Sequence, residues 1–358
     1  MPLKKPRPEA HIRGEKCRFH VTTEVCLPMK KARQDKPTAG PKTAHTKTSW
    51  GNLLFLACFV GLLVLAGASV YRNHLAKRAK TAAGNPVFGF IDTSGRMVIE
   101  PRFDFAYDFS EGFAGVQIDA RKGYINREGE LVIDAVYTDA GPFREGRAPV
   151  HLHGKYGYID TKGRLAIPPD YDRVGLFSQG RAPVAVEGRY GYIDRDGGLV
   201  IEPRFEHALP FSEDLAAVVV DQRAGFIDLD GVIVIEPQFE AVAPFVSGLA
   251  PAKKNGKWGY IDREGAFTIE PRFEDAQVFR EGLSPVLQDS TWGYAGPDGA
   301  LVIKPRFEKA RPFSQGLAAV KEDGLYGYIG PSGEYVIPPQ FKHAYPFSEG
   351  LARVRVTP

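Results

Sequence analysis

The chain has 358 residues, of which 43% are hydrophobic and 25% charged, and its formal net charge at pH 7 is +3. Residues 1–80 carry 16 Lys and Arg against 4 Asp and Glu, whereas residues 81–358 carry 30 against 39. The acidic remainder is a poor partner for nucleic acid, whose phosphates attract Lys and Arg, so we expect no nucleic-acid binding. Because Cys17, Cys26 and Cys58 all precede residue 81, the remainder has no disulfide and no cysteine zinc site.

An uncharged segment follows the basic N-terminal region. No residue from Thr48 to Tyr71 is charged, and Leu53–Val70 is apolar almost throughout. About 20 apolar residues span the hydrocarbon core of a bilayer, so we predict an uncleaved transmembrane signal anchor at residues 49–71. The alternative is a cleaved signal peptide with its cleavage site at the small residues Ala66-Gly67-Ala68.

Basic residues around this segment indicate its orientation. The positive-inside rule counts Lys and Arg within about 15–20 residues of a span, and here both flanks are basic. Because the preceding tail is the longer basic stretch, we expect it in the cytoplasm and the rest of the chain in the periplasm or at the cell surface. The predicted parts are a basic, disordered tail at 1–48, the anchor at 49–71, a linker at 72–87 and a repeat domain at 88–358.

The repeat domain consists of eight tandem repeats with a period of 34 residues, without insertion or deletion. Each unit begins with a marker glycine that is followed by Tyr or Phe. The markers are Gly89, Gly123, Gly157, Gly191, Gly225, Gly259, Gly293 and Gly327. Repeats of fixed period build arrays in which each unit packs only against its neighbours. A single unit has too few apolar side chains to fold alone, so we expect neighbouring units to complete its core.

The composition of one unit predicts strands. In Gly259–Trp292, the spacing of glycines and prolines leaves no stretch of three helical turns, which excludes helical-pair repeats of the same period. Short aromatic and β-branched runs between turn residues are typical of strands. Asp262 and Gly265 fit a hairpin turn, and Pro271 is expected to end the returning strand because it has no N–H. Each unit therefore predicts three strands and one crossing segment, extended or helical.

Tryptophan precedes the marker glycine in two units. The motifs are Lys257-Trp258-Gly259-Tyr260-Ile261-Asp262 and Trp292-Gly293-Tyr294, and several units end in a Phe-Ser-Glu-Gly-Leu-Ala pattern. In these motifs and in its period, the chain resembles the bacterial WG-repeat (KWG-repeat) family over residues 88–358. Other units depart by placing Tyr, Phe, Lys122 or Ala224 at the tryptophan position. The resemblance implies a β-rich repeat domain, often behind a signal or membrane segment, and no defined activity or catalytic residues.

The ends of the array leave two arrangements open. The first unit lacks a preceding strand, and the last strand, at Leu351–Val356, lacks a following Gly-Tyr-Ile-Asp partner. We favour an all-β, open β-repeat superhelix of eight tandem hairpin repeats. The alternative is a closed eight-bladed propeller, in which the last strand pairs with the first unit.

Few residues of the array suggest chemistry. The Asp194–Gly197 and Asp228–Gly231 segments have the Asp-x-Asp-Gly pattern of calcium loops but lack the further oxygen ligands, so we interpret them as hairpin turns. His151 and His153 share one strand face without a third zinc ligand. No nucleophile elbow, phosphate loop or catalytic triad order is present in the sequence. We expect no catalytic residues, no metal and no cofactor, and therefore not an enzyme.

The residue before each marker glycine is the candidate binding position. Because the copies include both Lys122 and Ala224, we expect it not to be fully buried. One interpretation is that this residue covers a groove between units. The other is an aromatic ladder that stacks on sugars or on a partner chain, and it consists of Tyr190, Trp258, Trp292 and Tyr326.

These observations predict a function without chemistry. We expect a membrane-anchored, non-enzymatic interaction module of the bacterial envelope, which displays a repetitive β surface to a protein or a glycan. One alternative is a structural spacer without a specific ligand. Another is a hydrolase in an atypical repeat.

Overall fold

The computed structural model describes residues 87–356, which form 32 β-strands and no helix. None of the described elements is therefore a helix that could cross a membrane. The predicted tail (1–48), the predicted anchor (49–71) and all but the last residue of the predicted linker (72–87) lie outside the described residues.

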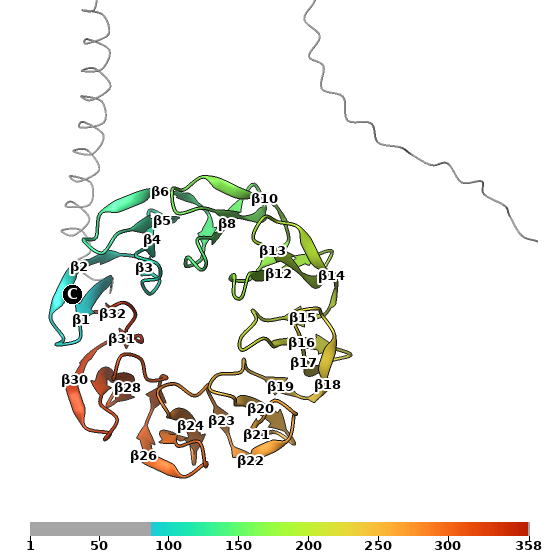
Figure 1. Ribbon diagram of the computed structural model, residues 1–358. Helices are drawn as coiled ribbons and strands as arrows, with labels where there is room; N and C mark the ends of the chain where they lie inside the picture. The colour runs from blue at the N-terminus through green and yellow to red at the C-terminus, as the bar shows by residue number, and fades with distance from the viewer. Residues whose placement is uncertain (1–86, 357–358) are drawn as a thin grey trace, which may run out of the picture. The chain divides into compact units, whose positions relative to one another are not determined.

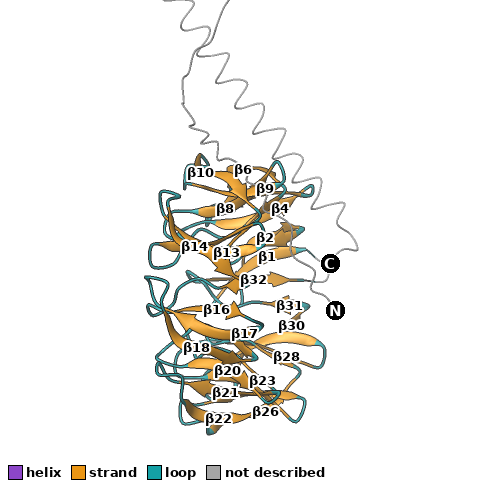
Figure 2. Cartoon of the chain, turned by 90° about the vertical axis from the view of Figure 1, so that its right-hand side faces the viewer, coloured by secondary structure: helices purple, strands orange, loops and turns teal. Residues whose placement is uncertain are grey.

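The strands form eight antiparallel sheets of four strands, arranged as the blades of a ring (Figure 1). Seen from the side, the ring is a single layer of blades (Figure 2). Blade 1 consists of β3–β6, blade 2 of β7–β10, and so on to blade 7 with β27–β30. Blade 8 combines β31 and β32 with β1 and β2.

Each blade runs from a short inner strand to a long outer strand. The inner strands are β3 (Phe105–Ala106), β7 (Asp139–Ala140), β11 (Arg173–Val174), β15 (His207–Ala208), β19 (Ala241–Val242), β23 (Asp275–Ala276), β27 (Lys309–Ala310) and β31 (His343–Ala344). The second strands are β4 (Ala114–Ile118), β8 (Ala148–Leu152), β12 (Arg181–Val186), β16 (Ala216–Val220), β20 (Ala250–Lys254), β24 (Ser284–Gln288), β28 (Ala318–Glu322) and β32 (Leu351–Arg355). The third strands are β1 (Phe88–Asp92), β5 (Arg121–Ile125), β9 (Lys155–Ile159), β13 (Arg189–Asp194), β17 (Arg223–Ile227), β21 (Lys257–Ile261), β25 (Thr291–Ala295) and β29 (Leu325–Ile329). The outer strands are β2 (Met97–Phe103), β6 (Leu131–Tyr137), β10 (Leu165–Tyr171), β14 (Leu199–Phe205), β18 (Ile233–Phe239), β22 (Phe267–Phe273), β26 (Leu301–Phe307) and β30 (Tyr335–Phe341).

The three predicted strands of each unit are confirmed, and the crossing segment is extended and contributes the inner strand of the next blade. The expectation that Pro271 ends its strand is wrong, because β22 continues to Phe273. β22 is the outer strand of its sheet and has no neighbour on its far side. A proline is tolerated there because its missing N–H costs no ladder hydrogen bond on that side.

The marker glycine is required by close backbone packing. A Cβ on Gly259 would lie 2.3 Å from the carbonyl oxygen of Ile269 on the neighbouring outer strand, a distance that no side chain tolerates. The hairpin turns follow the predicted chemistry as well. The carboxylate of Asp228 accepts hydrogen bonds from the backbone N–H groups of Asp230 (3.0 Å) and Val232 (2.8 Å). The interpretation of the Asp-x-Asp-Gly segments as turns is therefore confirmed.

The ring is closed, so the favoured open superhelix is wrong and the alternative, the eight-bladed propeller, is correct. β1 and β32 lie side by side (Figures 1 and 2) and pair from Phe88 opposite Arg355 to Asp92 opposite Leu351. The last unit supplies β31 and β32 to blade 8, and the first unit supplies β1 and β2. Closure leaves no unpaired blade at either end of the array.

The core lies between the blades. Eight clusters of buried apolar side chains each join one blade to the next, which confirms that neighbouring units complete the core. In each interface an aromatic residue after the marker glycine packs against a phenylalanine of the next blade, as Tyr192 does against Phe211 with ring centroids 4.9 Å apart. The hydroxyl of Tyr192 also donates to the carbonyl of Leu209 at 2.8 Å. Burial raises the pKa of Tyr192 well above its usual range, so this hydroxyl remains a donor.

A second set of contacts runs around one face of the ring. In most blades, a glutamate or glutamine in the turn between the inner and second strands accepts a hydrogen bond from a backbone N–H of the next blade, as Glu111 does from Gly146 at 2.9 Å. The same contact crosses the closure, where Glu349 accepts from Gly112 at 3.1 Å. Blade 8 is therefore joined to blade 1 by the contact that joins blades within the array.

Candidate functional site

The predicted binding position lies on the third strands, where each side chain packs toward the inner strand of the next blade. Phe88, Ala224, Trp292 and Tyr326 are buried there, with exposed fractions of 4–7%. The expectation that this position is never fully buried is therefore wrong for these four copies. The reason is contact with the following blade, as between Tyr326 and His343, whose rings are 6.0 Å apart.

The four residues of the predicted aromatic ladder are not equivalent in the structure. Trp292 and Tyr326 are buried, whereas Tyr190 and Trp258 are half-buried. The four lie in blades 3, 5, 6 and 7, one in each, and blade 4 interrupts the series with Ala224. Their role in binding remains a prediction, and burial restricts direct ligand contact to Tyr190 and Trp258.

The inner wall of the ring differs from blade to blade. At the residue just after each inner strand, two adjacent blades carry glycine, Gly141 in blade 2 and Gly175 in blade 3. The other blades carry side chains there, namely Tyr107, Leu209, Ala243, Gln277, Arg311 and Tyr345. The two glycines therefore remove side chains from one stretch of the wall.

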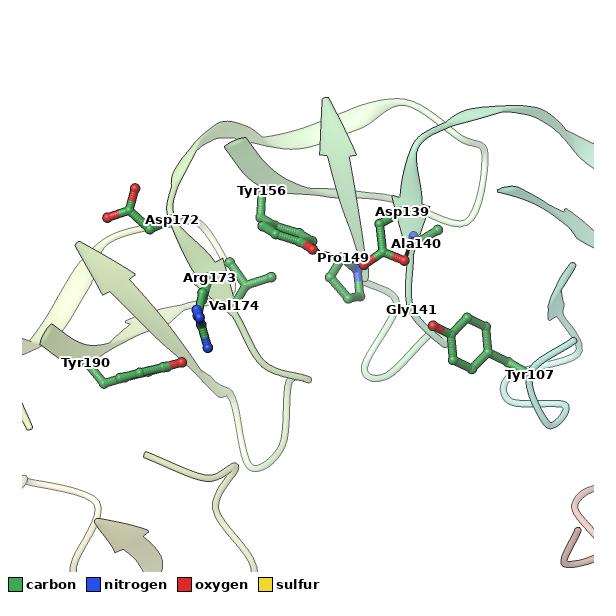
Figure 3. Close-up of a pocket in the computed structure, with 10 residues that line it drawn as sticks. All are labelled: Tyr107, Asp139, Ala140, Gly141, Pro149, Tyr156, Asp172, Arg173, Val174 and Tyr190. Atoms are coloured by element: carbon green, nitrogen blue, oxygen red, sulfur yellow. Dashed lines mark hydrogen bonds between the residues drawn. The ribbon is translucent and has the colours of Figure 1, made fainter. Parts of the chain in front are cut away.

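A cavity of about 510 Å³ opens at this stretch (Figure 3). We call it the hollow. Blades 1, 2 and 3 all contribute to it. Its lining residues are Tyr107, Asp139, Ala140, Gly141, Pro149, Tyr156, Asp172, Arg173, Val174 and Tyr190. Figure 3 shows Tyr156 and Asp139 at the centre, Tyr107 on one side, and Arg173 and Tyr190 on the other. One residue of the predicted ladder, Tyr190, thus lies in the hollow.

Asp139 is held by neighbours on both sides. Its carboxylate accepts hydrogen bonds from Lys122 Nζ at 2.5 Å and from the hydroxyl of Tyr156 at 2.9 Å. Lys122 also donates to the hydroxyl of Tyr107 at 3.2 Å. Burial opposes ionisation of Asp139, but these hydrogen bonds outweigh it and lower the pKa of the carboxyl group. Burial and the contact with Asp139 raise the pKa of Tyr156 to about 12, so the tyrosine is neutral and the aspartate ionised at neutral pH.

The other side of the hollow holds one ion pair and one unpaired cation. Asp172 forms an ion pair with Lys155 and accepts a hydrogen bond from the backbone N–H of Glu187 at 2.9 Å. The hydrogen bond from Lys155 lowers the pKa of Asp172. Arg173 is exposed, and its side chain makes no hydrogen bond or ion pair with any residue that the structure describes. Tyr190 beside it packs against the ring of His207 at 5.2 Å.

A second depression, of about 360 Å³, lies beside the hairpin turn of blade 5. It is lined by Lys254, Asn255, Lys257, Phe267, Glu270 and Pro271. Lys254 covers the ring of Phe267 at 6.0 Å. Only one aromatic ring faces this depression, and its own lysine occupies that ring.

The histidine pair of blade 2 does not form a metal site with a third ligand. His151 lies 2.7 Å from the hydroxyl of Thr138 and packs on Tyr156 at 4.6 Å, while His153 is exposed in the turn. Across residues 87–356, no three His, Cys, Asp or Glu side chains gather closely enough to hold a metal ion.

The family of the chain follows from its repeats. The description "WG containing repeat" matches eight consecutive segments, at 88–121, 123–156, 156–190, 190–223, 225–258, 258–292, 292–326 and 326–357. The chain belongs to the WG-repeat family. No curated protein matches it.

Several solved structures are similar to parts of the chain at low identity. One is a eukaryotic initiation factor, with 10% identity, a TM-score of 0.48, and coverage of 73% of this chain and 87% of that one. Another is the dihydro-heme d1 dehydrogenase NirN in complex with DHE, with 11% identity, a TM-score of 0.48, and coverage of 76% and 73%. A third is Hsv2p of Kluyveromyces lactis, with 13% identity, a TM-score of 0.40, and coverage of 54% and 74%. At these values the likenesses carry no argument about function.

Sequence reasoning on the WG repeats missed the hollow. It concentrated on positions that are aromatic, whereas the hollow is created by two positions that lack a side chain. The signal was present in the sequence, because Gly141 and Gly175 stand where every other repeat has a side chain. Arg173 was not predicted either, because only aromatic positions were selected as candidates. Its inner-strand position is occupied by His, Ala, Lys, Asp or Phe in the other units.

Proposed function

We propose that this WG-repeat protein is a non-enzymatic interaction module of the bacterial envelope, which binds its partner at the hollow. A ring of like blades provides a rigid support, and function on such a support depends on what varies between the blades. At the hollow, the inner wall lacks two side chains that the other blades carry. Its lining combines tyrosine rings, ionised carboxylates and an exposed arginine, which are groups that bind partners.

The observation that carries this proposal is that two adjacent glycines open the inner wall at a position where blade 5 keeps a side chain opposite proline. Gly141 and Gly175 each pair with a proline of the second strand, Pro149 and Pro183, through a backbone hydrogen bond. In blade 5 the same pair is Ala243 and Pro251, with the same hydrogen bond at 2.9 Å. A Cβ on Gly141 would lie 2.7 Å from Pro149 Cγ, and one on Gly175 would lie 2.5 Å from Pro183 Cγ, so these proline rings must shift to admit a side chain. The pair in blade 5 shows that the architecture accommodates such a shift. The two glycines thus avoid close contacts with the prolines, and they also leave the inner wall of blades 2 and 3 open to a ligand.

The proposal includes anchoring in the membrane by residues 49–71, with the propeller outside the cytoplasm. The apolar, uncharged composition of this segment and the basic tail before it support this arrangement. A reporter enzyme that is active only outside the cytoplasm, fused after Pro358, is expected to be active. A reporter that is well expressed but silent would place the propeller in the cytoplasm.

The binding role is tested by capture from a detergent extract of the envelope, with the full chain as bait. Tyr190→Leu removes a flat ring from the hollow, and Trp258→Leu is the matched change at the same repeat position in blade 5. We expect Tyr190→Leu to lose the captured partner and Trp258→Leu to retain it, with both variants folded by circular dichroism. If both variants lose the partner, the aromatic ladder and not the hollow is the binding surface. If no partner depends on either residue, the propeller is a spacer.

A further inference from the structure

We propose that the hollow binds a sugar that carries a carboxylate group, such as a hexuronate. The sugar ring would lie on the tyrosine faces, and its carboxylate would pair with Arg173. This inference rests on the proposed function, because it names the class of ligand for the same site. Three features of the hollow support it, namely its charge, its aromatic faces and its hydrogen-bond acceptors.

The charges of the hollow leave one cation without a partner. Asp139 is paired with Lys122, and Asp172 is paired with Lys155. The guanidinium of Arg173 is exposed and has no hydrogen-bond or ion-pair partner among residues 87–356. With Lys122 and Lys155 counted, the five charged groups sum to +1, so Arg173 is left to pair with an anion. A guanidinium and a carboxylate form two parallel hydrogen bonds in one plane, which fixes the orientation of a ligand as well as its charge.

Aromatic faces from three blades line the same cavity. Tyr107, Tyr156 and Tyr190 belong to blades 1, 2 and 3. Tyr156 and Tyr190 are each packed against a histidine ring, His151 at 4.6 Å and His207 at 5.2 Å. These contacts hold the two rings in place before a ligand arrives. A fixed aromatic face suits the C–H face of a sugar ring, because the negative π face attracts the weakly positive C–H hydrogens.

The two aspartates supply acceptors for sugar hydroxyl groups. An ionised carboxylate only accepts hydrogen bonds, and it has about four lone-pair positions. Lys155 and the N–H of Glu187 contact Asp172 in the structure. Its side chain is 38% exposed, so a hydroxyl group of a ligand has access to it. The lining thus offers a cation for the carboxylate of the ligand and acceptors for its hydroxyl groups.

The shape of the site favours a compact sugar over a peptide. A peptide that added itself as a strand would need an exposed sheet edge of several residues, and the inner strands β7 and β11 are two residues long. The volume of about 510 Å³ lies in the range of small-ligand sites, about 300–1,000 Å³. The apolar part of the lining consists of Ala140, Pro149 and Val174 beside the tyrosines, which gives no deep apolar slot for a peptide anchor.

The test titrates trigalacturonate into the purified full chain in detergent and measures heat of binding. The fully methyl-esterified trimer, which keeps the sugar rings and removes the charge, is titrated in parallel. Arg173→Ala copies the alanine that blade 5 carries at this position, Ala241, so it is expected to fold. Lys309→Ala is the matched control, because Lys309 is an exposed cation at the same position in blade 7. We expect the acidic trimer to bind, and Arg173→Ala to weaken it about tenfold, as loss of a charged hydrogen-bonded pair does.

The control variants and the competing ligands show whether the acidic sugar is recognised at the hollow. Lys309→Ala is expected to leave the affinity unchanged, and Tyr190→Leu to weaken it while Trp258→Leu does not. Equal affinity for the acidic and esterified trimers, or equal affinity of Arg173→Ala and the native chain, would overturn the inference. A hexaglutamate peptide that binds as well as the acidic trimer would overturn it in favour of peptide recognition. If trigalacturonate does not bind while Tyr190→Leu still abolishes partner capture, the hollow is a binding site of another class, and only the sugar inference fails.

Discussion

Two regions of this propeller differ in their inner wall, which is filled by side chains in one and open in the other. On blades 7, 8 and 1 the wall is filled by stacked side chains, with the Arg353 guanidinium 3.5 Å from the ring of Tyr345 and the Arg311 guanidinium 4.3 Å from the same ring. Arg353 also donates to Asp108 at 2.7 Å. On blades 2 and 3 the equivalent wall carries Gly141 and Gly175 and opens into the hollow. The filled region contains the closure of the ring, and the open region lies away from it.

The cores between blades follow the same division. Eleven buried apolar residues join blade 8 to blade 1, and eleven join blade 7 to blade 8. Six join blade 2 to blade 3. The core is thus largest on the two sides of blade 8, where the ends of the repeat domain meet, and smallest between blades 2 and 3, with the other cores between these values. One repeated unit serves a structural need in one region and leaves room for a ligand in the other.

The largest effect is expected from removing the closing strand. A chain that ends at Gly350 lacks Leu351, Ala352 and Val354, which are buried, and leaves β1 without its partner. Because a fully buried valine or leucine contributes about 1.5–3 kcal/mol, we expect a loss of several kcal/mol and a melting temperature lower by many degrees. Circular dichroism during heating measures this loss, and a chain that ends at Val356 is the control. Equal melting of both chains would mean that closure is not needed.

A smaller effect is expected from Arg353→Ala, which removes a cation from two aromatic rings, those of Tyr345 and Phe105. It also leaves Asp108 without this partner. We expect a loss of about 2 kcal/mol in the free energy of unfolding by denaturant. Arg173→Ala, on the open side, is expected to change it by less than about 0.5 kcal/mol. Similar losses in the two variants would remove the distinction between the regions.

Local opening should follow the size of the cores between blades. Backbone N–H groups are expected to exchange with deuterium sooner in blades 2 and 3 than in blades 7 and 8, because fewer buried residues resist opening there. Hydrogen exchange followed by mass spectrometry measures this order. The reverse order of exchange would show that the size of the core between blades does not set local stability.

Low pH is expected to reduce the stability of the blades around the hollow by protonating Asp139. The folded state lowers the pKa of this carboxyl group through Lys122 and Tyr156. Its contribution to stability is therefore present above the ordinary pKa of an aspartate, about 4, and is lost as the pH falls through the lower folded value. Asp139→Asn is expected to lack this loss, so that its unfolding free energy depends less on pH below about 4. Parallel pH profiles for the native chain and the variant would contradict this role.

The fold was largely predictable because the same information recurs eight times. The marker glycine, the following aromatic residue and the Asp–Gly turn each act over a few residues, and they correctly indicate strands and hairpins. Closure was not predictable in the same way, since it depends on pairing between Phe88 and Arg355, at opposite ends of the repeat domain. Pattern within a unit carries no information about the angle between units.

The candidate site was predictable only in part. Tyr190 was selected for its aromatic ring and lies in the hollow, whereas Trp292 was selected for the same reason and is buried. The difference lies in the next blade, because exposure of this position depends on what the following inner strand places against it. Gly141 and Gly175 were overlooked because a missing side chain offers no chemistry to a reader of sequence, although it creates the space for a ligand.

The central claim is that the hollow is the binding site, and filling it tests the claim most directly. Gly175→Leu combined with Pro183→Ala copies the pair that blade 4 already carries, Leu209 and Ala217. The same double change in blade 5, Ala243→Leu with Pro251→Ala, is the matched control away from the hollow. Both variants are expected to melt within a few degrees of the native chain. Loss of partner capture in the blade 3 variant alone is the predicted result, whereas undiminished capture by a folded chain with a filled hollow would contradict the account.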